Sequence, residues 1–268
     1  MVDNGSEPDP TPDVKSRSPS IRVIRLSTNL GYAGGCNAGV AAAFADGASH
    51  VLLLNNDTTI DVRTLPALMA AARRHPLSIL APKIVYADRP DVVWSAGGRV
   101  QGPLRRNEHL REGEPASRWD VERRVDWATG CALFTSRETF ERLGGMDEAY
   151  FLYLEDVDWC LRAAESGIDT WFVPGAVVRH EVSHTLGSPA WAPHVRYYAY
   201  RNRYRLAYRT GSALTRPVVV GDALWTLAKA GIRSATSSAH RRDSLYHART
   251  HAVLDFFRNR WGAYQAAG

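Results

Sequence analysis

An acidic and aromatic stretch, residues 144–162, constrains the fold of this chain more than any other feature of its sequence. It reads GGMDEAYFLYLEDVDWCLR, and five carboxylates fall between Asp147 and Asp158 among side chains that favour burial. Some of these acids must therefore lie next to buried apolar side chains, where the pKa of a carboxylate is shifted as it often is in active sites. The stretch predicts a helix that begins at Glu155.

The first turn of that helix would be acidic, which suits the positive end of a helix dipole. Positions 157, 160 and 161 would form its apolar face. We expect the three acids of the turn to point towards an opening rather than the core: Glu155, Asp156 and Asp158. An acidic turn that only caps a structural helix explains this stretch as well.

An apolar run at residues 51–54 predicts a central parallel strand that is covered on both faces. Asn55, Asn56 and Asp57 follow it directly. Ligands bind at the carboxyl ends of strands in open α/β sheets, so Asp57 stands where a metal ion or a sugar would be held. A turn that closes the strand through the Asp57 side chain is the alternative.

The remaining pattern alternates strands with helices. Residues 29–39 carry several glycines and predict a loop that approaches a ligand closely before a helix at 40–45. Residues 7–20, rich in Pro, Ser and Asp, predict a flexible loop. Strands are expected at 21–26, 79–86, 125–134, 170–173 and 176–180, and helices at 65–74 and 137–143.

The C-terminal part predicts helices. In residues 194–209 one stripe holds Tyr200, Tyr204 and Tyr208, and a second stripe holds Arg201, Arg205 and Arg209. We expect the tyrosines to pack on the domain and the arginines to face solvent or an anionic surface. Residues 222–233 and 243–261 are two further amphipathic segments, for which core packing and peripheral membrane contact are both explanations.

Composition excludes several classes of protein. Three scattered cysteines provide neither a disulfide framework nor a zinc site, so we expect a cytoplasmic protein. No apolar run approaches the roughly 18 residues that span a bilayer, so any membrane contact is peripheral, at the inner face of the plasma membrane. The 33 basic residues outnumber the 28 acidic ones, but they do not gather into a stripe that indicates nucleic-acid binding.

Together these motifs resemble the inverting family 2 glycosyltransferases of GT-A fold, in particular the rhamnosyltransferase-like branch. The resemblance covers roughly residues 1–210 and follows the order of the family's motifs. They are residues 2–6, 29–37, 54–57, 127–130, 145–148 and 155–159, and His180. It implies an α/β fold with a Rossmann-like sheet flanked by helices, a glycosyltransferase domain over 1–210 and a C-terminal helical extension over 211–268.

The resemblance also implies roles for individual residues. Asp156 would be the general base that deprotonates the acceptor hydroxyl. Asp57 and His180 would bind a divalent cation, Mn²⁺ or Mg²⁺. The nucleotide-sugar would contact Asp3, Gly31, Asn37, Asn55 and Asn56. The sugar and acceptor sites would be shaped by Trp127, Gly130, Asp147 and Glu155.

The implied reaction transfers a sugar, with inversion, from a nucleoside diphosphate to a hydroxyl of a cell-wall or polysaccharide acceptor. The branch points to dTDP-rhamnose as donor and to a lipid-linked glycan as acceptor. Family members normally carry a strand and a helix ahead of the motif at residues 2–6, and we expect this chain to lack them. The alternatives are an inactive glycan- or partner-binding remnant and a nucleotidyltransferase on a similar sheet.

Overall fold

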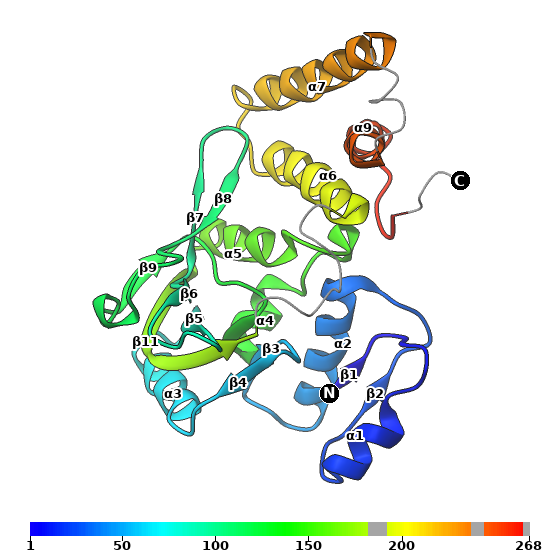
Figure 1. Ribbon diagram of the computed structural model, residues 1–268. Helices are drawn as coiled ribbons and strands as arrows, with labels where there is room; N and C mark the ends of the chain where they lie inside the picture. The colour runs from blue at the N-terminus through cyan, green and yellow to red at the C-terminus, as the bar shows by residue number, and fades with distance from the viewer. Residues whose placement is uncertain (182–191, 237–243, 265–268) are drawn as a thin grey trace.

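In the computed structural model, residues 1–181, 192–236 and 244–264 are described. They form an α/β fold, in which a mixed parallel and antiparallel β-sheet has helices on its faces and a group of C-terminal helices lies beyond one end (Figure 1). The main sheet has the order β3(His50–Leu54), β10(Ala132–Ser136), β5(Ser78–Tyr86), β11(Asp169–His180) and β4(Thr58–Ile60). β6(Val93–Ser95) pairs with β5, and β9(Arg123–Val125) pairs with β11.

Alternation along the central strands builds the two faces of this sheet. Ile79 and Ala81 of β5 point into a core shared with α5(Glu155–Glu165), whereas Leu80 between them packs against α3(Thr64–Arg74). β10 divides in the same way, with Leu133 on the first face and Phe134 on the second. The first face is also covered by α2(Gly31–Ala45) and α4(Arg137–Leu143).

The expected strand at 51–54 exists as β3, but its predicted place in the sheet is wrong. β3 pairs antiparallel with β10, and among the described residues it has no second strand neighbour. Leu54 is accordingly 39% exposed. An apolar run of this length cannot by itself distinguish a central strand from an edge strand that a helix covers, and α2 contacts β3 here.

Three other local predictions are corrected. The glycine-rich segment is not a loop before a helix, because α2 already begins at Gly31. Its glycines allow close contact with neighbouring segments. A Cβ at Gly31, where φ is +75°, would lie 2.3 Å from the Phe151 carbonyl oxygen. The loop expected at 7–20 contains α1(Thr11–Arg17). Residues 125–134 do not form one strand, because β9 ends at Val125 and β10 begins at Ala132.

The helices and strands predicted at 65–74, 79–86 and 137–143 are confirmed as α3, β5 and α4. The two strands expected at 170–180 are one strand, β11, with a shift of register between Val173 and Val177. β1(Val2–Asp3) and β2(Ile24–Arg25) form a separate parallel pair beside α2, and β7(Gly98–Gln101) and β8(Arg106–His109) form a hairpin. Short 3₁₀ helices cover Ala116–Arg118 and Glu148–Tyr150.

The C-terminal helices are α6(Pro193–Arg209), α7(Arg216–Thr236) and α9(Ser244–Phe257). α6 lies between the α/β body and the other two helices (Figure 1), and Tyr204 of α6 packs with Val219 of α7 and Val253 of α9. In the described parts of the chain, no helix combines the length and the apolar content that crossing a membrane requires.

Candidate active site

Two consecutive residues, Gly130 and Cys131, bring the distant candidate acids together. The Gly130 N–H donates a hydrogen bond of 2.7 Å to Oδ2 of Asp156, and the Cys131 carbonyl accepts one of 3.0 Å from the backbone N–H of Asn55. The acid at the start of α5 and the segment that follows β3 therefore meet at the beginning of β10. Tyr32 of α2 closes this junction by donating its hydroxyl hydrogen to the Gly130 carbonyl.

Asp57 and His180 meet at the neighbouring strand ends. Their closest atoms, Oδ2 and Nε2, are 3.2 Å apart, because β4 and β11 pair with Thr58 opposite His180 and the Glu181 N–H donates to the Asp57 carbonyl. Both side chains are almost completely buried. Oδ1 of Asp57 and Nδ1 of His180 have no hydrogen-bond partner among the described residues.

The negative charges of Asp57 and Asp156 act on one thiol. Burial raises the pKa of Cys131, and both carboxylates raise it further by repelling the thiolate. Repulsion of this kind falls with distance, so both acids lie within electrostatic reach of the same sulfur atom. The contacts of Gly130 with Asp156, of Cys131 with Asn55 and of Asp57 with His180 place these candidate residues on segments that meet before β10.

A row of aromatic rings lines the Asp57–His180 pair. Trp94 lies edge-on to His180, with ring centres 4.4 Å apart, and His109 follows at 4.6 Å from Trp94 and 4.9 Å from Trp127. Burial lowers the pKa of His109, although the charge of Glu112 opposes this shift, so the neutral imidazole is favoured. Sequence reasoning missed Trp94 and His109, because they come from a region without a recognisable pattern.

Glu155 is buried at the start of α5, and Asp156 beside it is half-buried. Burial raises the pKa of Asp156, although its hydrogen bonds from the Gly130 and Val157 N–H groups oppose that rise. The pKa of Glu155 is raised well above its usual range, by burial first and then by the charge of Asp156. Oε2 of Glu155 has no partner among the described residues. This arrangement favours a proton on Glu155 and the negative charge on Asp156.

The third acid of α5 does not point to an opening, contrary to the sequence-based expectation. Asp158 is fully buried and accepts hydrogen bonds from the Tyr150 hydroxyl at 3.0 Å and from Arg162 at 3.0 Å. Arg209 pairs with it from α6. Asp158 is therefore a structural residue that joins α5 to α6.

The loop before Glu155 is strained, and α6 holds it. Phe151, Tyr153 and Leu154 all have positive φ, at 63°, 69° and 72°, which costs about 1–3 kcal/mol for each residue. The Asn202 side-chain amide donates to three carbonyl oxygens of this loop, those of Tyr150, Leu152 and Tyr153, at 2.9, 2.7 and 2.8 Å. These bonds compensate for the strain and fix where α5 begins.

Arg201, beside Asn202, reinforces the same loop. It donates to the carbonyls of Ala149 and Tyr150 at 3.2 and 2.9 Å and is fully buried. The expectation that the arginine stripe of α6 faces solvent or an anionic surface is therefore wrong. Arg205 pairs with Asp147 at 2.6 Å, so the stripe faces the acidic segment of its own chain.

The residues predicted for nucleotide binding are not all in one place. Asn37 joins α2 to the acidic segment through hydrogen bonds to the N–H and the carbonyl of Met146, both at 2.9 Å, and Gly31 contacts Phe151. Asp3 is 3% exposed and contacts Ser6 and Arg25 instead. Asn55 is half-buried after β3, whereas Asn56 is exposed.

Two residues predicted for the sugar and acceptor sites already have partners within the fold. Trp127 is 2% exposed and donates its indole N–H to the Arg99 carbonyl. Asp147 caps the 3₁₀ turn at Glu148–Tyr150 and pairs with Arg205. Within the ranges that the structure describes, no cluster of three or more His, Cys, Asp or Glu residues could hold a metal ion unaided.

Sequence comparison connects this arrangement with known proteins. The family model described as glycosyl transferase family 2 matches residues 1–144. The N-acetylglucosaminyl-diphospho-decaprenol L-rhamnosyltransferase of Mycobacterium tuberculosis is 31% identical over 209 residues, which are 70% of this chain and 67% of that protein. The dTDP-rhamnosyl transferase RfbF of Shigella flexneri is 25% identical over 192 residues, which are 69% of this chain and 62% of that protein.

Solved structures show the same fold at low sequence identity. GalNAc-T7 with UDP, GalNAc and Mn²⁺ matches with a TM-score of 0.54 and 15% identity, over 81% of this chain and 46% of that one. The mannosyltransferase PcManGT from Pyrobaculum calidifontis, in complex with GDP-Man and Mn²⁺, matches with a TM-score of 0.51 and 16% identity, over 96% of this chain and 77% of that one. The GT-A fold predicted from the sequence is thereby confirmed.

The hold of α6 on the strained loop is testable by replacing Asn202 with leucine, which has nearly the same size but no amide. Asn202→Leu should lower the free energy of unfolding by about 3 kcal/mol, because the carbonyls of Tyr150, Leu152 and Tyr153 lose their side-chain donor. Urea denaturation measures this change. Asn107→Leu, the same replacement at an exposed position of β8, should change stability by less than about 0.5 kcal/mol. Equal effects of the two substitutions would contradict the assigned role of Asn202.

Proposed function

This chain belongs to glycosyl transferase family 2, and from that membership we propose that it transfers a sugar from a nucleoside diphosphate to a hydroxyl acceptor with inversion. The observation that carries the proposal is the junction at Gly130 and Cys131, where the candidate base Asp156 meets the segment that carries Asp57. The arrangement fits a direct displacement, in which a base and a leaving group flank one anomeric carbon.

Asp156 is proposed as the general base. A sugar hydroxyl is a weak nucleophile, so a positioned carboxylate accelerates attack by accepting its proton. Oδ2 of Asp156 is oriented by the Gly130 N–H, and burial raises its pKa, which makes it a stronger base than an exposed aspartate. Burial raises the pKa of Glu155, which favours its neutral form beside Asp156.

Asp57 and His180 are proposed to hold a divalent cation when the donor binds. Two observations support this proposal: Nε2 of His180 faces Oδ2 of Asp57 at 3.2 Å, and the buried Oδ1 of Asp57 has no hydrogen-bond partner among the described residues. One carboxylate, one imidazole and phosphate oxygens of the donor form a ligand set that suits Mn²⁺ or Mg²⁺. The cation would neutralise charge on the leaving diphosphate.

The proposed donor is dTDP-rhamnose, and the proposed acceptor is a lipid-linked glycan of the cell wall. Two rhamnosyltransferases are among the relatives, and one of them is named for a decaprenol-linked substrate. Asp3, Gly31, Asn37, Asn55 and Asn56 stay the candidates for donor binding. The candidates beside the sugar and the acceptor stay Trp127, Gly130, Asp147 and Glu155.

The base is tested by Asp156→Asn, which keeps the shape of the side chain and removes its basicity. Release of nucleoside diphosphate from a panel of nucleotide-sugars with acceptor should fall about 100-fold or more. Asp120→Asn, at an exposed position, is the matched control and should keep full activity. An Asp156→Asn variant as active as the control would refute this role.

The pH profile tests the ionisation of the same residue. Transfer requires the Asp156 carboxylate, and burial raises its pKa above the ordinary value of about 3.9. The kcat/KM should therefore decrease as the pH falls through that raised pKa, at a higher pH than an exposed aspartate would give. Measurement from about pH 4.5 to 9 should show this acidic limb. A flat profile in the range where the protein stays folded would contradict it.

Metal removal tests the role of Asp57 and His180. Transfer should stop when EDTA is added and should return with excess Mn²⁺ or Mg²⁺. Asp57→Ala should raise the Mn²⁺ concentration needed for half of the maximal rate, because one ligand is lost. The control Asp46→Ala, on an exposed residue after α2, should leave that concentration unchanged. Full activity in EDTA would rule out the cation.

A further inference from the structure

The outward face of α7 carries only apolar residues over four turns. The positions that face α6 and α9 include Val219, Ala223, Thr226 and Ala230, all of which are buried. From Pro217 to Ile232 every exposed position of α7 is apolar: Pro217, Val218, Gly221, Leu224, Trp225, Ala228, Gly231 and Ile232. Figure 1 places α7 at the end of the molecule, on the far side of α6 from the sheet.

The large side chains on this face are well exposed. Leu224 is 53% exposed, Trp225 is 57% exposed, and Val218 is 48% exposed. Leu214, in the turn before α7, is 87% exposed. A contiguous apolar face of this kind on a soluble domain marks a surface that contacts a partner or a membrane.

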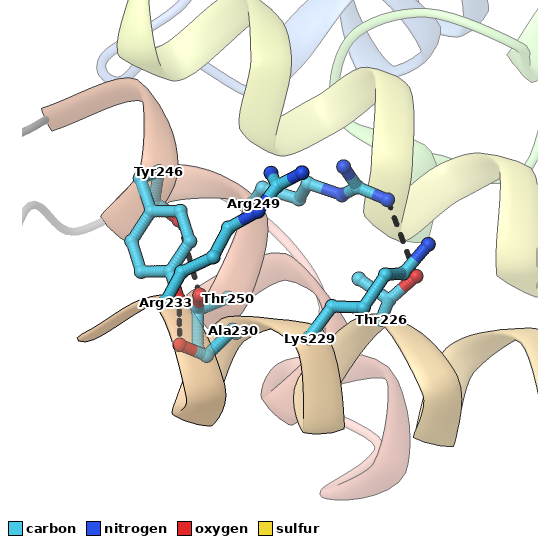
Figure 2. A pocket seen from close by; sticks show the side chains of 7 residues that line it. All are labelled: Thr226, Lys229, Ala230, Arg233, Tyr246, Arg249 and Thr250. Atoms are coloured by element: carbon cyan, nitrogen blue, oxygen red, sulfur yellow. Dashed lines mark hydrogen bonds between the residues drawn. The ribbon is translucent and has the colours of Figure 1, made fainter. Parts of the chain in front are cut away.

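Cationic side chains flank the face. The Lys229 ammonium lies 5.3 Å from the centre of the Trp225 ring. Lys229 and Arg233 also line a cavity of about 60 Å³ between α7 and α9 (Figure 2). Arg249 of α9 donates to the Thr226 hydroxyl in this cavity and therefore lies on the inward side of α7. The one acid of α7, Asp222, is turned inwards and accepts a hydrogen bond from the Tyr204 hydroxyl.

We propose that α7 lies in the plane of an anionic lipid bilayer, with its apolar face in the headgroup region and Lys229 and Arg233 near lipid phosphates. An apolar face with flanking cations and an exposed tryptophan is the pattern of an interfacial helix. At about 1.5 Å per residue, its 21 residues would extend for roughly 30 Å along the surface.

Charge favours a bilayer over a second copy of this chain as the occupant. In a two-fold pair of antiparallel α7 helices, Arg233 of one copy would approach Arg216 of the other, and like charges would face each other. An anionic bilayer attracts all of these cations instead. The proposal is independent of sugar transfer, since membrane binding can be measured without substrate.

Flotation with vesicles tests the proposal. The full chain should float with phosphatidylcholine vesicles that contain phosphatidylglycerol, and high salt should weaken this binding. The double variant Leu224→Asp/Trp225→Asp should bind the vesicles at least about tenfold more weakly than the wild type, because two side chains lose their apolar burial. The matched control Val62→Asp/Val121→Asp adds the same charge at exposed apolar positions elsewhere and should bind like the wild type.

A second variant, Trp225→Phe, tests the proposal even if the double variant Leu224→Asp/Trp225→Asp misfolds. Trp225→Phe keeps an apolar ring and should retain vesicle binding, but it should lose most of the fluorescence quenching that brominated lipids cause in the wild type. Binding that is equal in the two double variants, or no binding to anionic vesicles by the wild type, would overturn the proposal. A dimer in gel filtration that Leu224→Asp/Trp225→Asp abolishes, without vesicle binding, would assign the face to a second copy and overturn it too.

Discussion

The geometry of the candidate site depends on the hydrogen bonds that α6 makes to the backbone before Glu155. Three residues in this loop have positive φ without being glycine, and such a path persists only where its surroundings determine it. Asn202 and Arg201 supply those surroundings by donating to five carbonyl contacts within residues 149–153. A buried guanidinium would be costly without partners, so the loop and α6 stabilise each other.

Backbone hydrogen bonds also position the two candidate acids, Asp57 and Asp156. β10 lies in the sheet between β3 and β5, and the two residues before it, Gly130 and Cys131, form hydrogen bonds with α5 and with the segment after β3. The Gly130 N–H orients Asp156, and the Cys131 carbonyl fixes the chain before Asp57. The backbone of one short turn thus determines the relation between a proposed base on a helix and a proposed metal ligand at a strand end. Tyr32 at the start of α2 links the glycine-rich segment to that turn.

Local periodicity was sufficient to predict α3, β5, α4 and the beginning of α5, because each carries a clear apolar pattern or cap. Sheet order was not predictable, since the insertion of β10 beside β3 depends on pairing between distant segments. The burial of Arg201 was not predicted either. In the sequence, the arginines of α6 resemble a solvent-exposed helix face, and only the loop that Arg201 contacts in the fold explains why this side chain is buried. The ordered motifs allowed Asp57, Asp156 and His180 to be grouped, but no pattern marked Trp94, His109 or Asn202.

The central claim is that Asp57, His180 and Asp156 border one site for an activated sugar. Anomalous diffraction from crystals grown with Mn²⁺ and a nucleoside diphosphate tests it most directly. The account predicts a manganese peak within bonding distance of Asp57 and His180, with the diphosphate on the side of the site that Asp156 faces. A peak elsewhere on the molecule, or a diphosphate bound away from Asp156, would contradict it.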